Sequence, residues 1–225
     1  MNAPRKRTVW VFDAYGTLFD IHSAVRKQAA RLGESAVRLS QSWRTKQLEY
    51  SWVRSLMGRH ADFWDCTLAA LDFALAAEGL ADPALRDALC EAYRTPDAYG
   101  DAVATLRDLR AGGASTAILS NGSPQMLAAA VSHAGFEPLL DAVLSVEEVG
   151  IFKPDSRVYE LATARFSVAA AEIRFCSSNA WDIAGAQAFG FQTVWVNRTS
   201  QPEEYGIAAH AKVIRSLAEI AATQA

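Results

Sequence analysis

Four polar side chains stand shortly after strand-like apolar runs, and their types suggest chemistry on an anion. Asp13, Ser120, Lys153 and Asp182 follow the runs 8–12, 115–119, 142–146 and 173–176, respectively. A carboxylate at the end of a strand can act as a nucleophile, and a lysine beside it can balance its charge. If one parallel sheet contains all four runs, their carboxyl ends meet at one edge and the four side chains converge.

Each of these residues also fits an ordinary structural role when it is taken alone. Asp13 could form a turn at a strand exit, and the segment after Ser120 caps the next helix through Ser123 and Pro124, although capping does not explain the Ser120-Asn121 pair. Lys153 could be a solvated surface lysine, and Asp182 could be an acidic residue in the first turn of a helix. These alternatives stay open for the single residues, but four coincidences at four strand ends are improbable, so the set favours a site.

The elements around these residues predict an α/β fold. Strand-like runs occupy 8–12, 115–119, 142–146, 173–176 and 192–196, and helical patterns lie between them at 101–112, 124–134, 155–166 and 181–189. This alternation is typical of a doubly wound parallel sheet with helices on both faces. Residues 21–96 contain helical patterns only. We therefore expect an α/β core made of 1–20 and 97–225, with 21–96 inserted as an all-helical cap over the carboxyl ends of the strands.

Four helices are expected in this insertion. They run through Val25–Leu32, through Trp43–Arg54, over 60–78, and from Pro83 to Tyr93. Val53, Leu71 and Phe73 are expected to pack inside the cap.

Composition excludes several classes of protein. Of the 225 residues 51% are hydrophobic and 21% charged, which is globular rather than disordered composition, and the net charge of −3 gives no general attraction to nucleic acid. The three cysteines are scattered, so we expect no disulfide framework or zinc site and a reducing cytoplasmic location. No apolar stretch approaches the ~20 residues of a membrane helix.

Several motifs together resemble the haloacid dehalogenase superfamily and, within it, the L-2-haloacid dehalogenases of type II. The superfamily motifs are Asp13 with Gly16-Thr17, Ser120-Asn121, Lys153-Pro154 and Asp182. The narrower motifs are 12–20, Trp43-Arg44 with 46–50, Ser120-Asn121-Gly122, and 177–182. The resemblance covers nearly the whole chain and implies a Rossmann-like core with an inserted helical cap.

Tyr15 separates two activities of this superfamily. Its phosphatases place a second aspartate two positions after the nucleophile, as general acid and beside an Mg²⁺ ligand. Tyr15 offers no carboxylate, and Asn179 stands where an acidic residue could have added to metal binding. Because a halide leaving group needs neither a proton nor a metal, the missing carboxylates favour carbon–halogen cleavage, with no metal and no cofactor.

The resemblance also implies roles for individual residues. It implies a catalytic set of Asp13, Thr17, Arg44, Ser120, Lys153, Tyr159, Ser177, Asn179 and Asp182. The implied substrate pocket consists of Tyr15, Leu48, Phe63, Ser120, Asn121 and Trp181, and the implied halide site of Arg44, Asn121 and Trp181. For Phe63, core packing is an equal alternative. The family further implies a homodimer that takes a small 2-haloacid and contacts neither nucleic acid nor membrane.

The implied reaction has two steps. Asp13 displaces halide from C2 of an L-2-haloacid, and water then hydrolyses the aspartyl ester to release a D-2-hydroxy acid. In this scheme Ser120 holds the substrate carboxylate, Tyr159 helps orient Asp13 and Lys153, and Asp182 acts on the water. Two alternatives remain open: an Mg²⁺-dependent phosphatase of the same superfamily, and a binding protein without activity. Residue identity does not give the preferred chain length or halogen.

Overall fold

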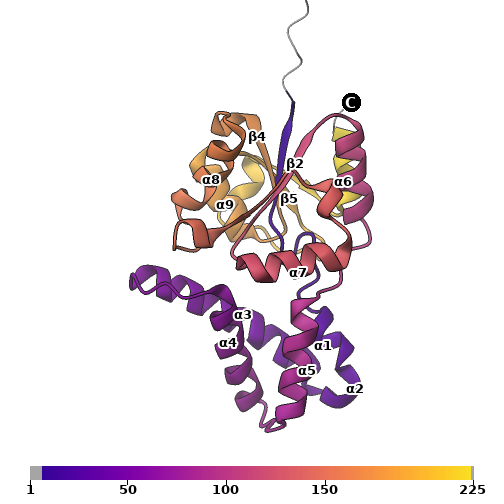
Figure 1. Ribbon diagram of the computed structural model, residues 1–225, viewed down its shortest axis with the longest axis vertical. Helices are drawn as coiled ribbons and strands as arrows, with labels where there is room; N and C mark the ends of the chain where they lie inside the picture. Colours follow the sequence, from indigo (N-terminus) through magenta and orange to yellow (C-terminus); the bar gives the residue numbers. More distant parts are fainter. Residues whose placement is uncertain (1–6, 224–225) are drawn as a thin grey trace, which may run out of the picture.

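A six-stranded parallel sheet forms the centre of the computed structural model, which describes residues 7–223 and the side chains of 7–220 (Figure 1). The strands are β1 (Val9–Phe12), β2 (Ser115–Ser120), β3 (Ala142–Ser145), β4 (Ile173–Ser177), β5 (Gln192–Val196) and β6 (Ala211–Ile214), in the order β3-β2-β1-β4-β5-β6. β1 and β2 are buried along their whole length, as expected for strands covered on both faces.

The five expected strands are confirmed, and β6 was not expected. β6 is an edge strand of four residues, and its two central residues, Lys212 and Val213, are exposed. Such a strand lacks the buried apolar run by which the other five were identified.

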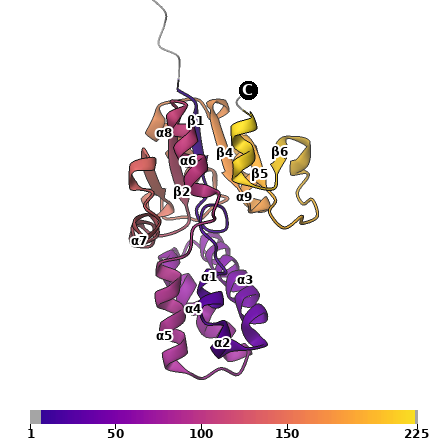
Figure 2. The same ribbon diagram turned by 90° about the vertical axis from the view of Figure 1, so that its right-hand side faces the viewer.

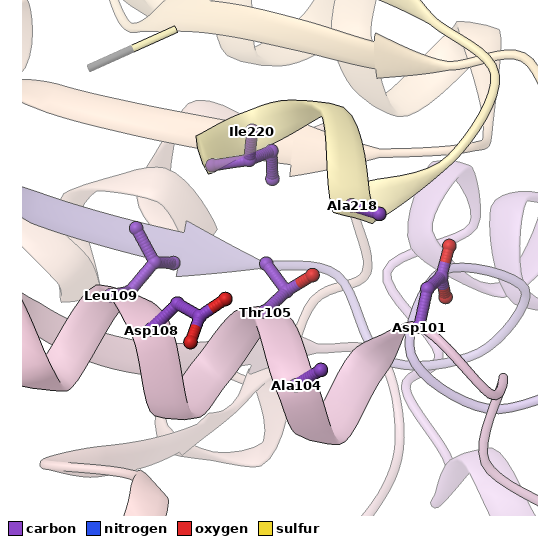
Figure 3. Close-up of a pocket in the computed structure, with 7 residues that line it drawn as sticks. All are labelled: Asp101, Ala104, Thr105, Asp108, Leu109, Ala218 and Ile220. Carbon is purple, nitrogen blue, oxygen red and sulfur yellow. The ribbon is translucent and has the colours of Figure 1, made fainter. Parts of the chain in front are cut away.

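Helices cover both faces of the sheet (Figures 1 and 2). The α-helices of the core are α6 (Ala102–Ala111), α7 (Pro124–Ala134), α8 (Ser156–Phe166) and α9 (Ala180–Phe189). Short 3₁₀ segments are η1 (Glu137–Leu139), η2 (Val146–Glu148), η3 (Ala170–Glu172), η4 (Ile207–Ala209) and η5 (Leu217–Thr223). η5 packs on α6 on one face, as Figure 3 shows in close-up, and α8 packs against α9 on the other.

The first five helices after β1 lie together beyond one end of the sheet (Figure 1). They are α1 (Ser23–Lys27), α2 (Ala29–Leu32), α3 (Ser35–Leu56), α4 (Phe63–Ala77) and α5 (Pro83–Arg94). The expected first helix is divided into α1 and α2 at Gln28. The expected helix over 60–78 begins only at Phe63, because the Asp62 side chain accepts a hydrogen bond from the Trp64 N–H and caps it there.

Within this helical cap, α3 and α4 pack against each other more extensively than any other pair of helices. Leu71 is buried there as expected, but the expectation for Val53 and Phe73 was wrong, since their side chains are 44% and 43% exposed. Helical spacing alone does not say which of several apolar residues faces the partner helix. Within residues 7–223, no helix combines the length and the apolar character that crossing a membrane requires.

Candidate active site

The carboxyl ends of the strands bring the predicted polar residues together below the cap. Asp13 follows β1 directly, Ser120 ends β2, Lys153 lies in the loop before α8, and Asp182 lies in the first turn of α9. The Lys153 Nζ atom is 3.3 Å from Asp13 Oδ1 and 2.9 Å from Asp182 Oδ2. The predicted convergence at one edge of the sheet is therefore present in the fold.

Lys153 is fully buried, so the interpretation as a solvated surface lysine was wrong. Its ammonium group also donates to the carbonyl oxygen of Leu119 over 2.7 Å. With Asp13 and Asp182 this makes three acceptors, which matches the three N–H donors of an ammonium group. The charge of Lys153 thus lies between two carboxylates that would otherwise repel each other.

Asp182 is bound on both oxygens. Oδ2 accepts from Lys153, and Oδ1 accepts from the Tyr159 hydroxyl over 2.8 Å. Burial raises the pKa of the Asp182 carboxyl to about 6, against the opposing effects of Lys153 and of the Tyr159 hydroxyl. Tyr159 was expected to help orient Asp13 and Lys153. Its hydroxyl contacts Asp182, which in turn accepts from Lys153.

Asp13 is held by a set of donors from two loops. Its Oδ2 atom accepts from the Thr17 hydroxyl (3.0 Å), from the Asn179 side-chain amide (2.8 Å) and from the Ser177 hydroxyl (3.4 Å). Thr17 is itself fixed, since its hydroxyl oxygen accepts the Ser178 backbone N–H over 2.8 Å. The carboxylate is thereby held in one orientation with 5% of the residue exposed.

Arg44 reaches from α3 of the cap toward the core. Its Nη2 atom donates to the side-chain oxygen of Asn179 over 3.3 Å and to the Tyr15 carbonyl over 3.5 Å, while Nη1 donates to Gln47 over 2.9 Å. Asn179 therefore contacts both the guanidinium group and the Asp13 carboxylate. An arginine on a solvated helix face, which is the usual position of this residue type, would not make these contacts.

A small cavity of about 10 Å³ lies between these groups. It is lined by Asp13, Tyr15, Arg44, Leu48, Phe63, Ser120, Asn121 and Trp181. These include all the residues that were predicted to form the substrate pocket and the halide site. Since a water molecule needs about 10–15 Å³, the cavity in this arrangement has room for little more than one.

Ser120 and Asn121 have donors available for an anion. The Ser120 oxygen accepts the Gly122 N–H over 3.0 Å, which leaves the hydroxyl proton free to be donated. The Asn121 oxygen accepts the Lys153 backbone N–H over 3.0 Å, which leaves the amide NH₂ group as its donor. Both residues are buried, so an anion in the cavity would meet them with little competition from water.

Aromatic rings form the apolar part of the cavity wall. Tyr15 stacks on Tyr93 with ring centroids 5.9 Å apart, and its buried hydroxyl has no hydrogen-bond partner. A Cβ atom on Gly122 would approach the Tyr15 ring to 2.8 Å, so glycine is needed there. Phe63 is 1% exposed and also lines the cavity, which means that both interpretations of this residue hold.

A second hollow lies away from these residues, between α6 and η5 (Figure 3). Its lining includes the carboxylates of Asp101 and Asp108 and no basic side chain that could bind an anionic ligand. Among residues 7–223, no group of three or more His, Cys, Asp or Glu side chains is arranged to hold a metal ion.

Sequence reasoning missed three residues that support the site. Ser178 fixes Thr17, Gln47 contacts Arg44, and the Trp52 indole N–H donates to the Lys153 carbonyl over 3.2 Å. Gln47 could have been found from its position three residues after Arg44, on the same face of a helix. Trp52 carried no such signal, because its partner is 101 residues away.

Comparisons with known proteins agree with this geometry. The family model of haloacid dehalogenase-like hydrolases matches residues 8–190. (S)-2-haloacid dehalogenase 1 from Pseudomonas sp. (strain CBS-3) is 51% identical over 211 residues, which cover 93% of each chain. A dehalogenase crystal structure has a TM-score of 0.93 at 46% identity and covers 97% of both chains.

A further similar structure contains a covalently bound ligand. L-2-haloacid dehalogenase from Xanthobacter autotrophicus, with chloropropionic acid covalently bound, has a TM-score of 0.89 at 36% identity, over 97% of this chain and 98% of that one. The chain described here therefore belongs to the haloacid dehalogenase-like hydrolases and, within them, to the family of the (S)-2-haloacid dehalogenases.

Proposed function

We propose that this protein hydrolyses L-2-haloalkanoic acids to D-2-hydroxyalkanoic acids through an ester on Asp13. One observation carries the proposal: the Asp13 carboxylate and the Arg44 guanidinium group line the same small cavity. Its other lining residues are apolar or aromatic or carry an amide or a hydroxyl group. The cavity thus pairs a nucleophile with a cation that can receive an anionic leaving group. Tyr15, in the position of the phosphatase acid, offers no carboxylate for a phosphate leaving group.

In the first step, an oxygen of Asp13 attacks C2 of the substrate from the side opposite to the halogen. A carbon–oxygen bond forms, the carbon–halogen bond breaks, and the halide leaves with the bonding electrons. Arg44, the Asn121 amide and the Trp181 ring receive the halide. Guanidinium suits this role because it stays charged and is weakly hydrated.

In the second step, water attacks the aspartyl carbonyl carbon and gives up a proton to a base. The bond between this carbon and the ester oxygen breaks, and that oxygen takes up a proton to become the hydroxyl group of the product. Asn179, which donates to Asp13 Oδ2, is placed to orient this water. Asp182 is the proposed base, and burial raises its pKa toward neutrality. Because both its oxygens are occupied by Lys153 and Tyr159, the water either displaces one of these contacts or passes its proton through Lys153.

The substrate carboxylate is proposed to bind Ser120 and nearby backbone N–H groups. The Ser120 hydroxyl proton is free for this purpose, since its oxygen already accepts the Gly122 N–H. This contact fixes the carboxylate, and Arg44 fixes the halogen, opposite to Asp13. The alkyl group and the hydrogen on C2 then share the two remaining positions, and the proposed place of the alkyl group against Tyr15 and Leu48 gives the preference for one enantiomer.

Residues 21–96 are proposed to act as a cap that opens for substrate and closes for reaction. The two linkers run side by side at the proposed boundary: the Asp20 N–H donates to the Asp97 carbonyl over 2.8 Å, and the Tyr99 N–H to the Leu18 carbonyl over 2.9 Å. A cavity with room for about one water must enlarge to admit a haloacid, so closure would exclude bulk water from the ester.

Homodimer formation and a cytoplasmic location are also proposed. Val53, Leu56 and Phe73 expose apolar side chains on α3 and α4, which supports association through the cap. Sedimentation equilibrium is expected to give a dimer for the native chain and a monomer for Phe73→Asp. The three cysteines are free, which fits a reducing compartment.

The test of the activity is halide release from the separate enantiomers of 2-chloropropionate and 2-bromopropionate. Release from the L enantiomers, with little from the D enantiomers, is expected. Hydrolysis of a generic phosphoester in place of halide release would support a phosphatase, and no turnover of either class would support a binding protein.

A further inference from the structure

Gln47 lies in the cap directly behind Arg44 and has no part in the reaction as proposed above. It is on α3, three residues after Arg44, and is 1% exposed. Its side-chain oxygen accepts from Arg44 Nη1 over 2.9 Å, and its side-chain nitrogen donates to the Thr67 hydroxyl over 2.6 Å and to the Tyr93 hydroxyl over 2.9 Å. A buried amide with every polar atom satisfied has a fixed orientation.

The neighbours of Gln47 determine which end of the amide faces Arg44. The Thr67 hydroxyl donates its proton to the Phe63 carbonyl over 2.7 Å, so its oxygen can only accept from Gln47. The NH₂ group of Gln47 must therefore face Thr67. Arg44 has donors only, and it requires the amide oxygen on its own side. Both ends of the network demand the same orientation.

Arg44 is consequently held by neutral acceptors. Gln47 supplies one amide oxygen from the cap, and Asn179 supplies another from the core over 3.3 Å. Within the part of the chain that the structure describes, no carboxylate forms an ion pair with Arg44. Arg198 shows the opposite arrangement, since both its terminal nitrogens donate to the Asp101 carboxylate at 2.8 and 3.0 Å. The charge of Arg44 thus remains available to an anion in the cavity, whereas that of Arg198 is neutralised.

We propose that Gln47 is a positioning residue for Arg44, whose neutral amide fixes the guanidinium group toward the cavity without cancelling its charge. The inference rests on the proposed role of Arg44 as the group that receives the halide. It requires two properties of the Gln47 side chain: a hydrogen-bond acceptor facing Arg44, and no charge. One substitution can change the charge and another the acceptor, so the two properties can be tested separately.

Gln47→Glu keeps the size and the acceptor but adds a negative charge beside Arg44. We expect chloride binding, followed by ³⁵Cl NMR line broadening, to weaken on the order of tenfold or more, because the carboxylate competes with the anion for the guanidinium charge. The matched control is Gln192→Glu, which adds the same charge at the exposed amino end of β5, away from Arg44, and is expected to bind chloride like the native chain. Chloride affinity of Gln47→Glu within about twofold of the native value would overturn the proposal.

Gln47→Met removes the acceptor without adding charge, and it also serves if Gln47→Glu does not fold. The halide-release step in a single turnover is expected to slow on the order of tenfold, with a smaller change in KM, because a misplaced guanidinium group acts mainly in the transition state. An unchanged rate of halide release would contradict a positioning role. The NMR measurement needs no turnover, so loss of the proposed activity in the native chain and failure of the Gln47 inference give different results.

Discussion

The side chains of Lys153 and Asp182 form an ion pair of 2.9 Å in which neither group is exposed to solvent. Removing two charges from water is costly, and the cost is offset only when the geometry is good and the remaining donors are satisfied. Here Lys153 also binds Asp13 and the Leu119 carbonyl, and Asp182 also binds Tyr159. Asp13, the proposed nucleophile, is therefore one end of a chain of buried hydrogen bonds that extends from β1 through α9 to α8.

Lys153→Met is expected to lower the free energy of unfolding at pH 7.5 by about 3–5 kcal/mol, because it leaves two buried carboxylates without a cation. Burial already raises the pKa of Asp182 to about 6, and loss of Lys153 removes an effect that lowers it. An acid whose pKa is raised in the folded state loses stability as the pH rises from its unfolded value to its folded one. The decrease in the free energy of unfolding caused by Lys153→Met should therefore be smaller at pH 5 than at pH 7.5. Urea unfolding at both pH values measures this, with exposed Lys212→Met as the control, and equal decreases would contradict it.

Tyr159→Phe is expected to move the acidic limb of kcat to higher pH. The Tyr159 hydroxyl lowers the pKa of Asp182 by donating to its carboxylate, and the ring packing against Phe175 and Phe191 is kept in the variant. Since Asp182 must be ionised to act, activity should rise with pH through about 6 in the native chain. A lost hydrogen bond to a charged group corresponds to a shift of about one pH unit. The measurement is the pH dependence of the single-turnover rate of hydrolysis. If the acidic limb of this profile has the same midpoint in both proteins, Tyr159 only packs against its neighbours.

The sequence allowed the strand ends and the residues just beyond them to be predicted, because buried parallel strands have a clear apolar signal and their carboxyl ends must meet. Asp13, Ser120 and Asp182 were found in this way. The contacts that cross from cap to core were beyond such reasoning. Arg44 meets Asn179 across 135 residues, and Trp52 meets Lys153 across 101, and no local pattern fixes either distance. The expected burial of Val53 was wrong for the same reason, because it depends on how elements pack, as does the contact of Tyr159 with Asp182.

Halide release should be unaffected by exhaustive chelation. Tyr15 offers no carboxylate beside Asp13, and Asn179 places an amide that donates to Asp13 Oδ2 over 2.8 Å where an acidic residue could have added to metal binding. Activity is measured after dialysis against EDTA, with and without added Mg²⁺. Loss of activity that Mg²⁺ restores would overturn the metal-independent reaction and favour the phosphatase-type site.

The reaction is expected to invert the configuration at C2 once. Asp13 must approach C2 opposite to the halogen, and hydrolysis at the aspartyl carbonyl leaves C2 untouched. Chiral chromatography of the product from pure L-2-chloropropionate should therefore give D-lactate. L-lactate would mean that C2 is inverted twice or not at all. Racemic lactate would indicate ionisation at C2.

Asp13→Asn should abolish halide release while leaving the thermal melting temperature close to the native value, because an amide is too weak a nucleophile to displace halide. Asp20→Asn is the matched comparison, since Asp20 pairs with Arg26 outside the cavity and should retain most of the activity. Near-normal turnover by Asp13→Asn would place the nucleophile elsewhere.

The formation of an ester on Asp13 is tested most directly by a single turnover in H₂¹⁸O, with enzyme in excess over L-2-chloropropionate. Mass spectrometry then follows the oxygen label in the 2-hydroxy acid and in the peptide that contains Asp13. If Asp13 attacks C2 and water attacks the aspartyl carbonyl, the product carries unlabelled oxygen from the enzyme and the label enters Asp13. If the label appears in the product of this first turnover and Asp13 stays unlabelled, water attacks C2 directly and the covalent mechanism is contradicted.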